Sequence, residues 1–252
     1  MQKIMVIIPT YNEKQNLPLI VAALFELNII GLEILVVDDK SPDGTGDIAE
    51  TLRADYDQKV HVLHRTEKNG LGPAYIAGFK HALSLGAEII VQMDADFSHQ
   101  PKYLLELLEK IKTHDLVLGS RFAKGGSVDE NWSAYRKLLS WFANRVYTPT
   151  ILGMPIYDAT GGFKVWKRET LLGMDIDRIQ SNGYVFQVEM NYVAYKLGYS
   201  LTEVAELTFW ASICGLVAAV SAGFIYYKLG AKWSLLLFGL LQTLGIAGYG
   251  LL

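Results

Sequence analysis

Short apolar runs alternate with longer amphipathic stretches over the first 120 residues of the chain. The apolar runs at residues 4–8, 33–37, 60–64, 88–93 and 115–119 predict buried β-strands. The stretches between them, at residues 17–28, 45–54, 73–85 and 101–112, predict helices. Alternating strands and helices indicate an α/β fold, with a mostly parallel sheet that carries helices on both faces.

Three of the predicted strands end in clusters of polar residues. The clusters are Tyr11-Asn12-Glu13, Asp38-Asp39 and Asp94-Ala95-Asp96. In parallel α/β sheets, ligands bind outside the carboxyl ends of the strands. The three clusters are therefore predicted to contribute to one ligand site.

Asp94 and Asp96 are the strongest candidates for metal ligands. They stand two residues apart, so in an extended segment their carboxylates project to the same side. Two hard oxygen ligands suit Mg²⁺ or Mn²⁺, with coordination positions left for phosphate oxygens. An acidic turn gives the same pattern, and Ser98 fits the N-cap of the helix that follows. From these residues alone, both interpretations stay open.

Basic residues follow the fifth predicted strand. Arg121 comes directly after it, and a helix that begins near Asn131 carries Arg136 and Ser140 one turn apart on one face. The guanidinium group is a forked donor that suits phosphate, although a solvated helix face explains Arg136 equally well. Beside a metal–diphosphate site, the two arginines indicate a second phosphate, carried by an acceptor.

The hydrophobic content of 51% is unevenly distributed along the chain. In residues 207–252, only Lys228 and Lys232 are charged. The uncharged runs 207–227 and 233–252 are each long enough, at roughly 30 Å as helices, to cross a hydrocarbon core. They predict a C-terminal transmembrane helical hairpin, a two-helix membrane anchor at 207–252 behind a catalytic domain at 1–206. Two buried helices are the alternative.

Charge and the missing motifs exclude several classes of protein. A net charge of −3 argues against nucleic-acid binding, and the single cysteine, Cys214, excludes a disulfide framework or a CxxC zinc site.

The first residues lack the features of a secretory signal, so the N-terminus is expected in the cytosol. With that orientation the two lysines between the apolar runs face outward, against the positive-inside tendency. The absence of Walker A, GxGxxG, HExxH and GxSxG motifs disfavours NTPases, dehydrogenases, zinc hydrolases and serine hydrolases.

Several motifs together resemble a known enzyme family. IIPTYNE at 7–13, VVDD at 36–39 with SPDGT at 41–45, and MDADFSH at 93–99 resemble family 2 of the inverting glycosyltransferases. GSRF at 119–122, NW at 131–132, YRK at 135–137 and GYVFQVE at 183–189 are similar to the dolichol-phosphate mannose synthases of that family, which have a GT-A fold. The resemblance covers residues 3–204 in the right order.

The resemblance implies transfer of mannose from GDP-mannose to dolichyl or other polyprenyl phosphate, with inversion, on the cytoplasmic face of a membrane. It implies Mg²⁺ or Mn²⁺ on Asp94 and Asp96, and an acceptor phosphate on Arg121, Arg136 and Ser140. Asp94, Asp96 and Arg121 are the implied catalytic residues. The implied nucleotide-sugar residues are Pro9, Tyr11, Glu13, Val37, Asp39, Asp94, Ala95, Asp96 and Arg121.

The chain departs from the family pattern after a predicted strand at 200–204. The family continues there with an RxxGxSK segment that closes over the donor, whereas this chain continues into its apolar tail. Two alternatives therefore stay open, a UDP-glucose-dependent polyprenyl-phosphate glucosyltransferase and a non-catalytic membrane-anchored homologue. The length of the polyprenol, the oligomeric state and any partner subunits are not fixed by the sequence.

Overall fold

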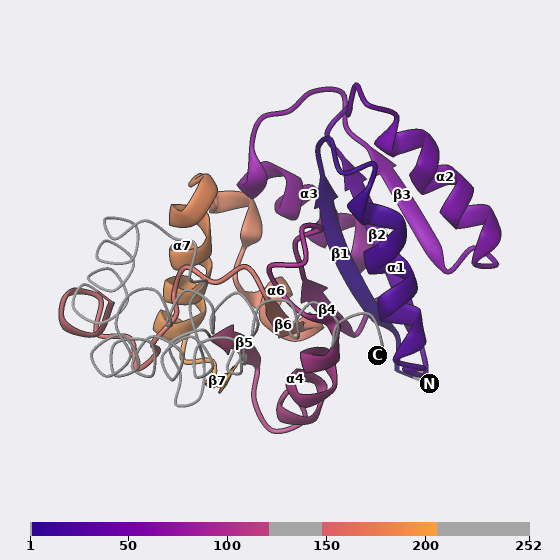
Figure 1. The fold of residues 1–252 in the computed structure, drawn as a ribbon. Coiled ribbons are helices and arrows are strands. Elements are labelled where there is room, and N and C mark those ends of the chain that lie inside the picture. The colour runs from indigo at the N-terminus through magenta and orange to yellow at the C-terminus, as the bar shows by residue number, and fades with distance from the viewer. Residues whose placement is uncertain (1, 121–147, 206–252) are drawn as a thin grey trace, which may run out of the picture. The chain divides into compact units, whose positions relative to one another are not determined.

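The computed structural model describes residues 2–120 and 148–205 (Figure 1). The strands of this part are β1 (Ile4–Thr10), β2 (Leu32–Asp38), β3 (Val60–His64), β4 (Ile89–Gln92), β5 (Leu116–Ser120), β6 (Lys164–Lys167) and β7 (Leu201–Ala205). The α-helices are α1 (Asn16–Glu26), α2 (Thr45–Asp55), α3 (Leu71–Ser84), α4 (Leu104–Lys110), α6 (Arg168–Gly173) and α7 (Gly183–Lys196). Short 3₁₀ turns are η1 (Pro101–Tyr103) and η3 (Ile176–Arg178).

The strands form one sheet in the order β3-β2-β1-β4-β6-β5-β7. Every neighbouring pair is parallel except the two pairs that involve β6, which is antiparallel to both β4 and β5. The predicted α/β fold with a mostly parallel sheet is therefore confirmed. The chain builds outward from β1 through β2 to β3 and then returns to the other side of β1 with β4. Such a reversal leaves a crevice at the carboxyl ends of the strands, where ligands of these folds bind.

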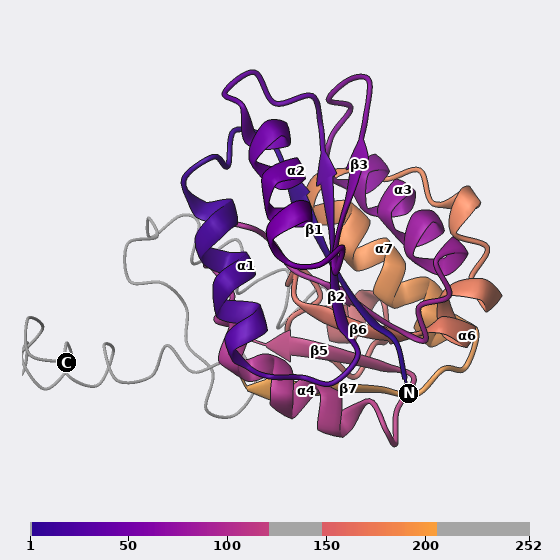
Figure 2. The same cartoon turned by 90° about the vertical axis from the view of Figure 1, so that its right-hand side faces the viewer.

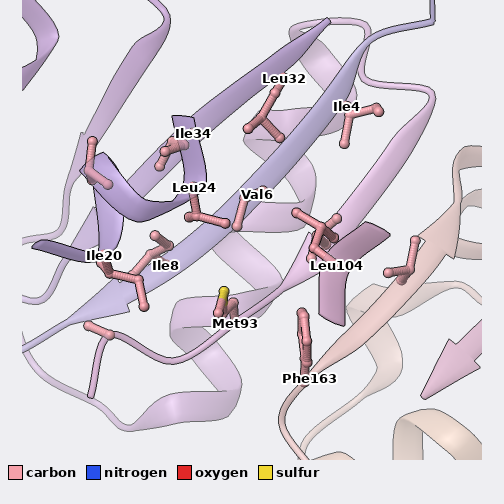
Figure 3. Packing of buried hydrophobic residues seen from close by; sticks show 14 of the residues in the cluster. Ile4, Val6, Ile8, Ile20, Leu24, Leu32, Ile34, Met93, Leu104 and Phe163 are labelled. Carbon is pink, nitrogen blue, oxygen red and sulfur yellow. The ribbon is translucent and has the colours of Figure 1, made fainter. Parts of the chain in front are cut away.

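Both faces of the sheet are covered by helices (Figure 2). Along β1, Ile4, Val6 and Ile8 pack with apolar residues of α1 and α4, while Met5 and Ile7 pack with residues of α3 and α7. Figure 3 shows the first of these two clusters. Because successive side chains of a strand point to opposite faces, a strand buried on both faces must be apolar throughout. This explains the unbroken apolar run that identified β1 in the sequence.

Three local expectations need correction. The strand β6 was not predicted, and it lies between β4 and β5. The helix expected at residues 101–112 begins as η1 and ends at Lys110. Ser98 is not its N-cap, since Gln100 occupies that position and the backbone N–H of Ser98 donates instead to Asp96 Oδ1, at 2.9 Å.

Among residues 2–120 and 148–205, no helix combines the length and apolar character needed to cross a membrane. The predicted two-helix anchor at 207–252 lies outside the described residues. Arg121, Arg136 and Ser140 lie outside them as well.

Candidate functional site

A pocket of about 290 Å³ opens at the carboxyl ends of β1, β2 and β4. It brings together residues from all three polar clusters that follow these strands. Seven of the residues implied to bind the nucleotide sugar line it, namely Pro9, Tyr11, Glu13, Asp39, Asp94, Ala95 and Asp96.

Of the two remaining implied donor-binding residues, Val37 does not line this pocket. Val37 is fully buried and packs beneath α3 with the second apolar cluster. Arg121 is outside the described residues, but β5 ends at Ser120, and β5 runs in the same direction as β4 because both are antiparallel to β6. The chain therefore leaves β5 at the edge of the sheet that carries the pocket.

The loop before α3 and its first turns supply a side of the pocket that sequence reasoning missed. Lys68, Gly70, Leu71 and Ala74 line it, together with Thr10 of β1. Gly70 is the N-cap of α3 and Leu71 is its first residue, so the start of this helix also shapes the pocket. Lys68 Nζ lies 3.5 Å from the centroid of the Tyr11 ring, close enough for a cation–π contact.

Charge in this pocket is strongly unbalanced. Among the described lining residues, four are carboxylates, Glu13, Asp39, Asp94 and Asp96, and one is a lysine, Lys68. A nucleoside diphosphate is itself an anion, so its binding here requires further positive charge. A divalent cation between ligand and protein is the ordinary way to supply it.

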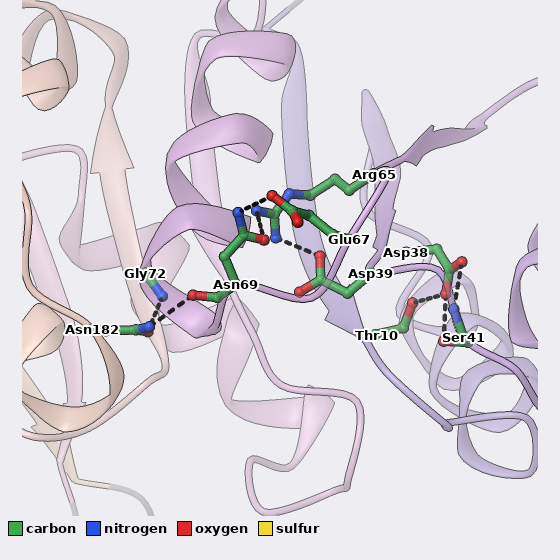
Figure 4. A network of polar contacts seen from close by, with 9 residues as sticks. All are labelled: Thr10, Asp38, Asp39, Ser41, Arg65, Glu67, Asn69, Gly72 and Asn182. Atoms are coloured by element: carbon green, nitrogen blue, oxygen red, sulfur yellow. Dashed lines mark hydrogen bonds and ion pairs between the residues drawn. The ribbon is translucent and has the colours of Figure 1, made fainter.

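The two adjacent aspartates at the end of β2 have different surroundings (Figure 4). Asp38 is buried and accepts hydrogen bonds from the Ser41 hydroxyl at 2.6 Å, the Ser41 backbone N–H at 3.2 Å and the Thr10 hydroxyl at 3.3 Å. These bonds fix the turn after β2 against the end of β1. Asp38 is therefore a structural residue, whereas Asp39 lines the pocket.

Asp39 is held by Arg65, which follows β3. The two side chains form an ion pair with only 13% of Arg65 and 7% of Asp39 exposed. Burial is the largest influence on the pKa of Asp39 and raises it above its ordinary value, although the Arg65 guanidinium acts in the opposite direction. Arg65 also donates to Asn69 Oδ1 at 3.4 Å, which connects this pair to the loop before α3.

Replacing Arg65 by methionine is expected to lower the free energy of unfolding by about 3 kcal/mol at neutral pH, because it leaves a buried carboxylate unpaired. Since the pKa of Asp39 is already raised in the folded protein, the loss of Arg65 raises it further. The folded state then binds the proton more tightly than the unfolded state, so the penalty is full above the folded pKa and shrinks as the pH falls toward about 4. Urea unfolding of Arg65→Met and of the unchanged protein at several pH values between 4 and 8 measures how this loss of free energy changes with pH.

The Asp39→Asn, Arg65→Met double variant is the control for this pair. It carries no buried charge at these two positions, so its stability is expected to vary little more with pH than that of the unchanged protein. If Arg65→Met loses the same free energy at every pH, the ion pair does not govern the ionisation of Asp39.

Asn182, the N-cap of α7, holds the loop before α3 in place. Its Oδ1 accepts from the backbone N–H of Gly72 at 3.1 Å, and its Nδ2 donates to the carbonyl oxygen of Asn69 at 2.9 Å (Figure 4). Two residues of the pocket wall, Gly70 and Leu71, lie between these anchor points. The structure thus fixes one wall of the pocket from a helix that is more than a hundred residues away in the sequence.

The carboxylates of Asp94 and Asp96 are each bonded through one oxygen. Asp94 Oδ1 accepts from the Tyr75 hydroxyl at 2.8 Å, and Asp96 Oδ1 accepts from the Ser98 backbone N–H at 2.9 Å. Within the described residues, no three His, Cys, Asp or Glu side chains gather as a metal-binding group. A cation here would therefore have two protein carboxylates at most from this part of the chain, and phosphate oxygens and water would complete its coordination. Mg²⁺ in nucleotide sites is bound in this way, so the residues present fit such an ion.

A buried polar network lies between β4, β6 and α7. The ammonium of Lys164 has no exposed surface and donates to the carbonyl oxygen of Gln187 at 3.0 Å and to its Oε1 at 2.7 Å. Gln92 bridges Gln187 and the indole N–H of Trp166. Burial lowers the pKa of Lys164 well below its usual value, although the charges of Asp158 and Asp94 act to raise it. The lysines at the two ends of β6, Lys164 and Lys167, leave only two apolar residues between them, which explains why this strand was not predicted.

Glu189 of α7 has a structural contact. Its Oε2 accepts from the backbone N–H of Ser181 at 3.1 Å, which stabilises the turn that leads into the helix. Glu189 does not line the pocket.

The α/β fold and the carboxylate-rich pocket favour an enzyme that binds a phosphorylated ligand with a divalent cation, and comparison with known proteins identifies its family. Residues 5–172 match the family described as glycosyl transferase family 2. This chain belongs to that family and is a glycosyltransferase.

Two curated relatives are similar over most of the chain. An undecaprenyl-phosphate mannosyltransferase of Micrococcus luteus is 44% identical over 250 residues, covering 97% of this chain and 100% of the relative. A polyprenol monophosphomannose synthase of Mycolicibacterium smegmatis is 46% identical over 204 residues, covering 81% of this chain and 76% of the relative.

Solved structures share the fold at low sequence identity. Glucosyl-3-phosphoglycerate synthase of Mycobacterium tuberculosis, in complex with Mn²⁺, uridine diphosphate and phosphoglyceric acid, has a TM-score of 0.55 at 20% identity, with 89% of this chain and 78% of that chain covered. A mannosyltransferase of Pyrobaculum calidifontis, in complex with GDP-mannose and Mn²⁺, has a TM-score of 0.53 at 20% identity, with 82% of this chain and 56% of that chain covered. Both support a GT-A-like α/β fold.

Proposed function

We propose that this glycosyltransferase transfers mannose from GDP-mannose to a polyprenyl phosphate, with inversion, to form polyprenyl-phosphate β-mannose. The observation that carries the proposal is the pocket that gathers Tyr11, Asp39, Asp94 and Asp96 at one sheet edge. The names of the two curated relatives support mannose as the sugar and a polyprenyl phosphate as the acceptor.

Different residues of the pocket are proposed to contact different parts of the donor. Asp39, Tyr11, Asp94 and Asp96 all line the pocket. Asp39 and Tyr11 are proposed to contact the nucleoside, and Asp94 and Asp96 are proposed to lie beside the diphosphate. A divalent cation, Mg²⁺ or Mn²⁺, bound by these two carboxylates would neutralise the charge that develops on the departing GDP. Arg121, Arg136 and Ser140 are proposed to hold the acceptor phosphate.

An acceptor phosphate is already ionised near neutral pH, so the reaction needs no strong general base. Glu189 is not needed as a base in this proposal, and its Oε2 accepts from the Ser181 backbone N–H at 3.1 Å. Catalysis would then depend on orientation of the two substrates and on electrostatic stabilisation of the leaving group.

The missing RxxGxSK segment does not argue strongly against activity. The Micrococcus luteus relative, a mannosyltransferase by name, matches along its entire length and over 97% of this chain. The match therefore includes most of residues 207–252, where the departure from the family pattern lies. We propose that this segment is a two-helix membrane anchor behind the catalytic domain at 1–206, and that it keeps that domain beside its lipid substrate on the cytoplasmic face.

A transfer assay tests the function directly. The full chain in detergent is incubated with radiolabelled GDP-mannose or UDP-glucose, a polyprenyl phosphate, and either Mg²⁺, Mn²⁺ or EDTA. We expect label in the lipid fraction from GDP-mannose only, and loss of that label with EDTA. Transfer from UDP-glucose alone would favour a glucosyltransferase, and no transfer from either donor would favour a non-catalytic homologue.

A further inference from the structure

Tyr75 of α3 is a buried side chain whose hydroxyl reaches into the donor site. Its oxygen donates to Asp94 Oδ1 at 2.8 Å, yet the residue has no exposed surface. It directly follows Ala74, which lines the pocket. The Tyr75 side chain therefore approaches Asp94 from the protein interior, on the side away from the ligand.

The Tyr75 ring is fixed on both sides. It stacks on Phe79 of the same helix and on Phe186 of α7, in both cases with ring centroids 6.0 Å apart, and it is nearly parallel to Phe186, at 2°. All three residues are fully buried. Aromatic stacking in a close-packed core leaves the ring few alternative orientations, so the hydroxyl has a fixed position.

The Tyr75 hydroxyl is the donor in this contact. An ionised carboxylate can only accept hydrogen bonds, so the phenolic O–H is directed to one oxygen of Asp94.

The other oxygen of Asp94 lies close to Gly162 and His99. A Cβ atom built on Gly162 would lie 2.9 Å from Asp94 Oδ2, and His99 Nε2 lies 4.0 Å from the same oxygen. The absence of a side chain at Gly162 gives this oxygen its space. Asp96 is arranged in a similar way, with Oδ1 bonded to the Ser98 backbone N–H.

We infer that Tyr75 is a positioning residue, which holds Asp94 through Oδ1 and so orients the carboxylate with Oδ2 toward a divalent cation. This role rests on the proposed metal site at Asp94 and Asp96. Ligating carboxylates are ordinarily hydrogen-bonded by residues behind them, and removal of such partners lowers metal affinity by roughly 10- to 100-fold. Tyr75 would do this with a hydroxyl that is set by the contact between α3 and α7.

The test compares Tyr75→Phe, which removes the hydroxyl and keeps the ring, with the unchanged full chain. GDP binding is titrated calorimetrically with and without Mn²⁺, and Mn²⁺ binding is followed by electron paramagnetic resonance. We expect the gain in GDP affinity on adding Mn²⁺ to fall at least about 10-fold in Tyr75→Phe, with Mn²⁺-free GDP binding unchanged. Excess Mn²⁺ should restore transfer activity.

Tyr56→Phe is the matched control, because Tyr56 stacks on Phe25 with centroids 4.5 Å apart on the opposite face of the sheet. Tyr56→Phe should gain as much GDP affinity from Mn²⁺ as the unchanged protein does.

If Tyr75→Phe also gains as much GDP affinity from Mn²⁺ as the unchanged protein, the role of Tyr75 is overturned, while the proposed metal site is retained. Failure of the unchanged protein to gain GDP affinity from Mn²⁺ would overturn the metal site, and with it this role. Tyr75→Phe could also lose transfer activity that excess Mn²⁺ does not restore and bind GDP more weakly without Mn²⁺. That result would show that Tyr75 stabilises the pocket and does not position a metal ligand.

Discussion

Replacing Asp96 by asparagine is expected to lower kcat for sugar transfer by at least about 100-fold, because cation-dependent stabilisation of a leaving diphosphate contributes several kcal/mol. The amide oxygen of asparagine can still accept the bond from the Ser98 backbone N–H, so the local turn should persist. What the substitution removes is the negative charge on a residue that lines the pocket. The loss should be measured as initial rates of mannosyl transfer at saturating donor and acceptor.

Asp55→Asn is a suitable control for this experiment. Asp55 is an exposed residue at the end of α2, and the same change of charge there should leave kcat within about twofold. The melting temperature of Asp96→Asn should stay close to that of the unchanged protein. If Asp96→Asn retains a normal rate, Asp96 does not bind the cation, and the proposed role of the Asp94–Asp96 pair fails.

The fold was largely predictable because both faces of the sheet are buried. The strands β1, β2, β4 and β5 are mostly continuous apolar runs, and these four strands and β3 were each located within two residues of their observed ends. The strand β6 was not predictable on the same grounds, since it places Lys164 in the core and pairs antiparallel between two strands that precede it. Only a partner distant in sequence, Gln187, makes that lysine tolerable there.

Some residues of the pocket could likewise be predicted from the sequence, and others could not. Residues that follow strand ends, such as Tyr11 and Asp94, could be placed at one edge because parallel strands point the same way. Residues that depend on helix packing could not be placed. Tyr75 looks like an ordinary core aromatic on a helix face, and Asn182 looks like a helix cap, yet one reaches Asp94 and the other holds the pocket wall.

Replacing Gly70 by alanine is expected to lower stability and to weaken donor binding, because Gly70 lies in the pocket wall that Asn182 holds. Gly70 has φ +105° and ψ 174°, a region open almost only to glycine, so alanine there costs on the order of 1–3 kcal/mol in strain. Its Cβ would also lie 2.0 Å from Asn182 Nδ2. Asn182 can move away only by giving up its bonds to Gly72 and Asn69, each worth about 1 kcal/mol. We expect a combined loss of about 3 kcal/mol in the free energy of unfolding and a KM for the donor raised roughly 10-fold.

The clash with Asn182 can be separated from the backbone strain by a double-mutant cycle in urea. Asn182→Ala alone removes these two bonds and also the N-cap bond from the Gly183 backbone N–H, so it should lower stability by about 2–3 kcal/mol. In the Gly70→Ala, Asn182→Ala variant the clash is gone, so the combined loss should be smaller than the sum of the single losses by at least about 1 kcal/mol. Strictly additive losses would mean that Asn182 does not press on the loop at Gly70, and that the pocket wall owes its position to the backbone of the loop alone. A non-additive result, with the KM of Asn182→Ala also raised, would show that α7 sets the donor pocket through this side chain.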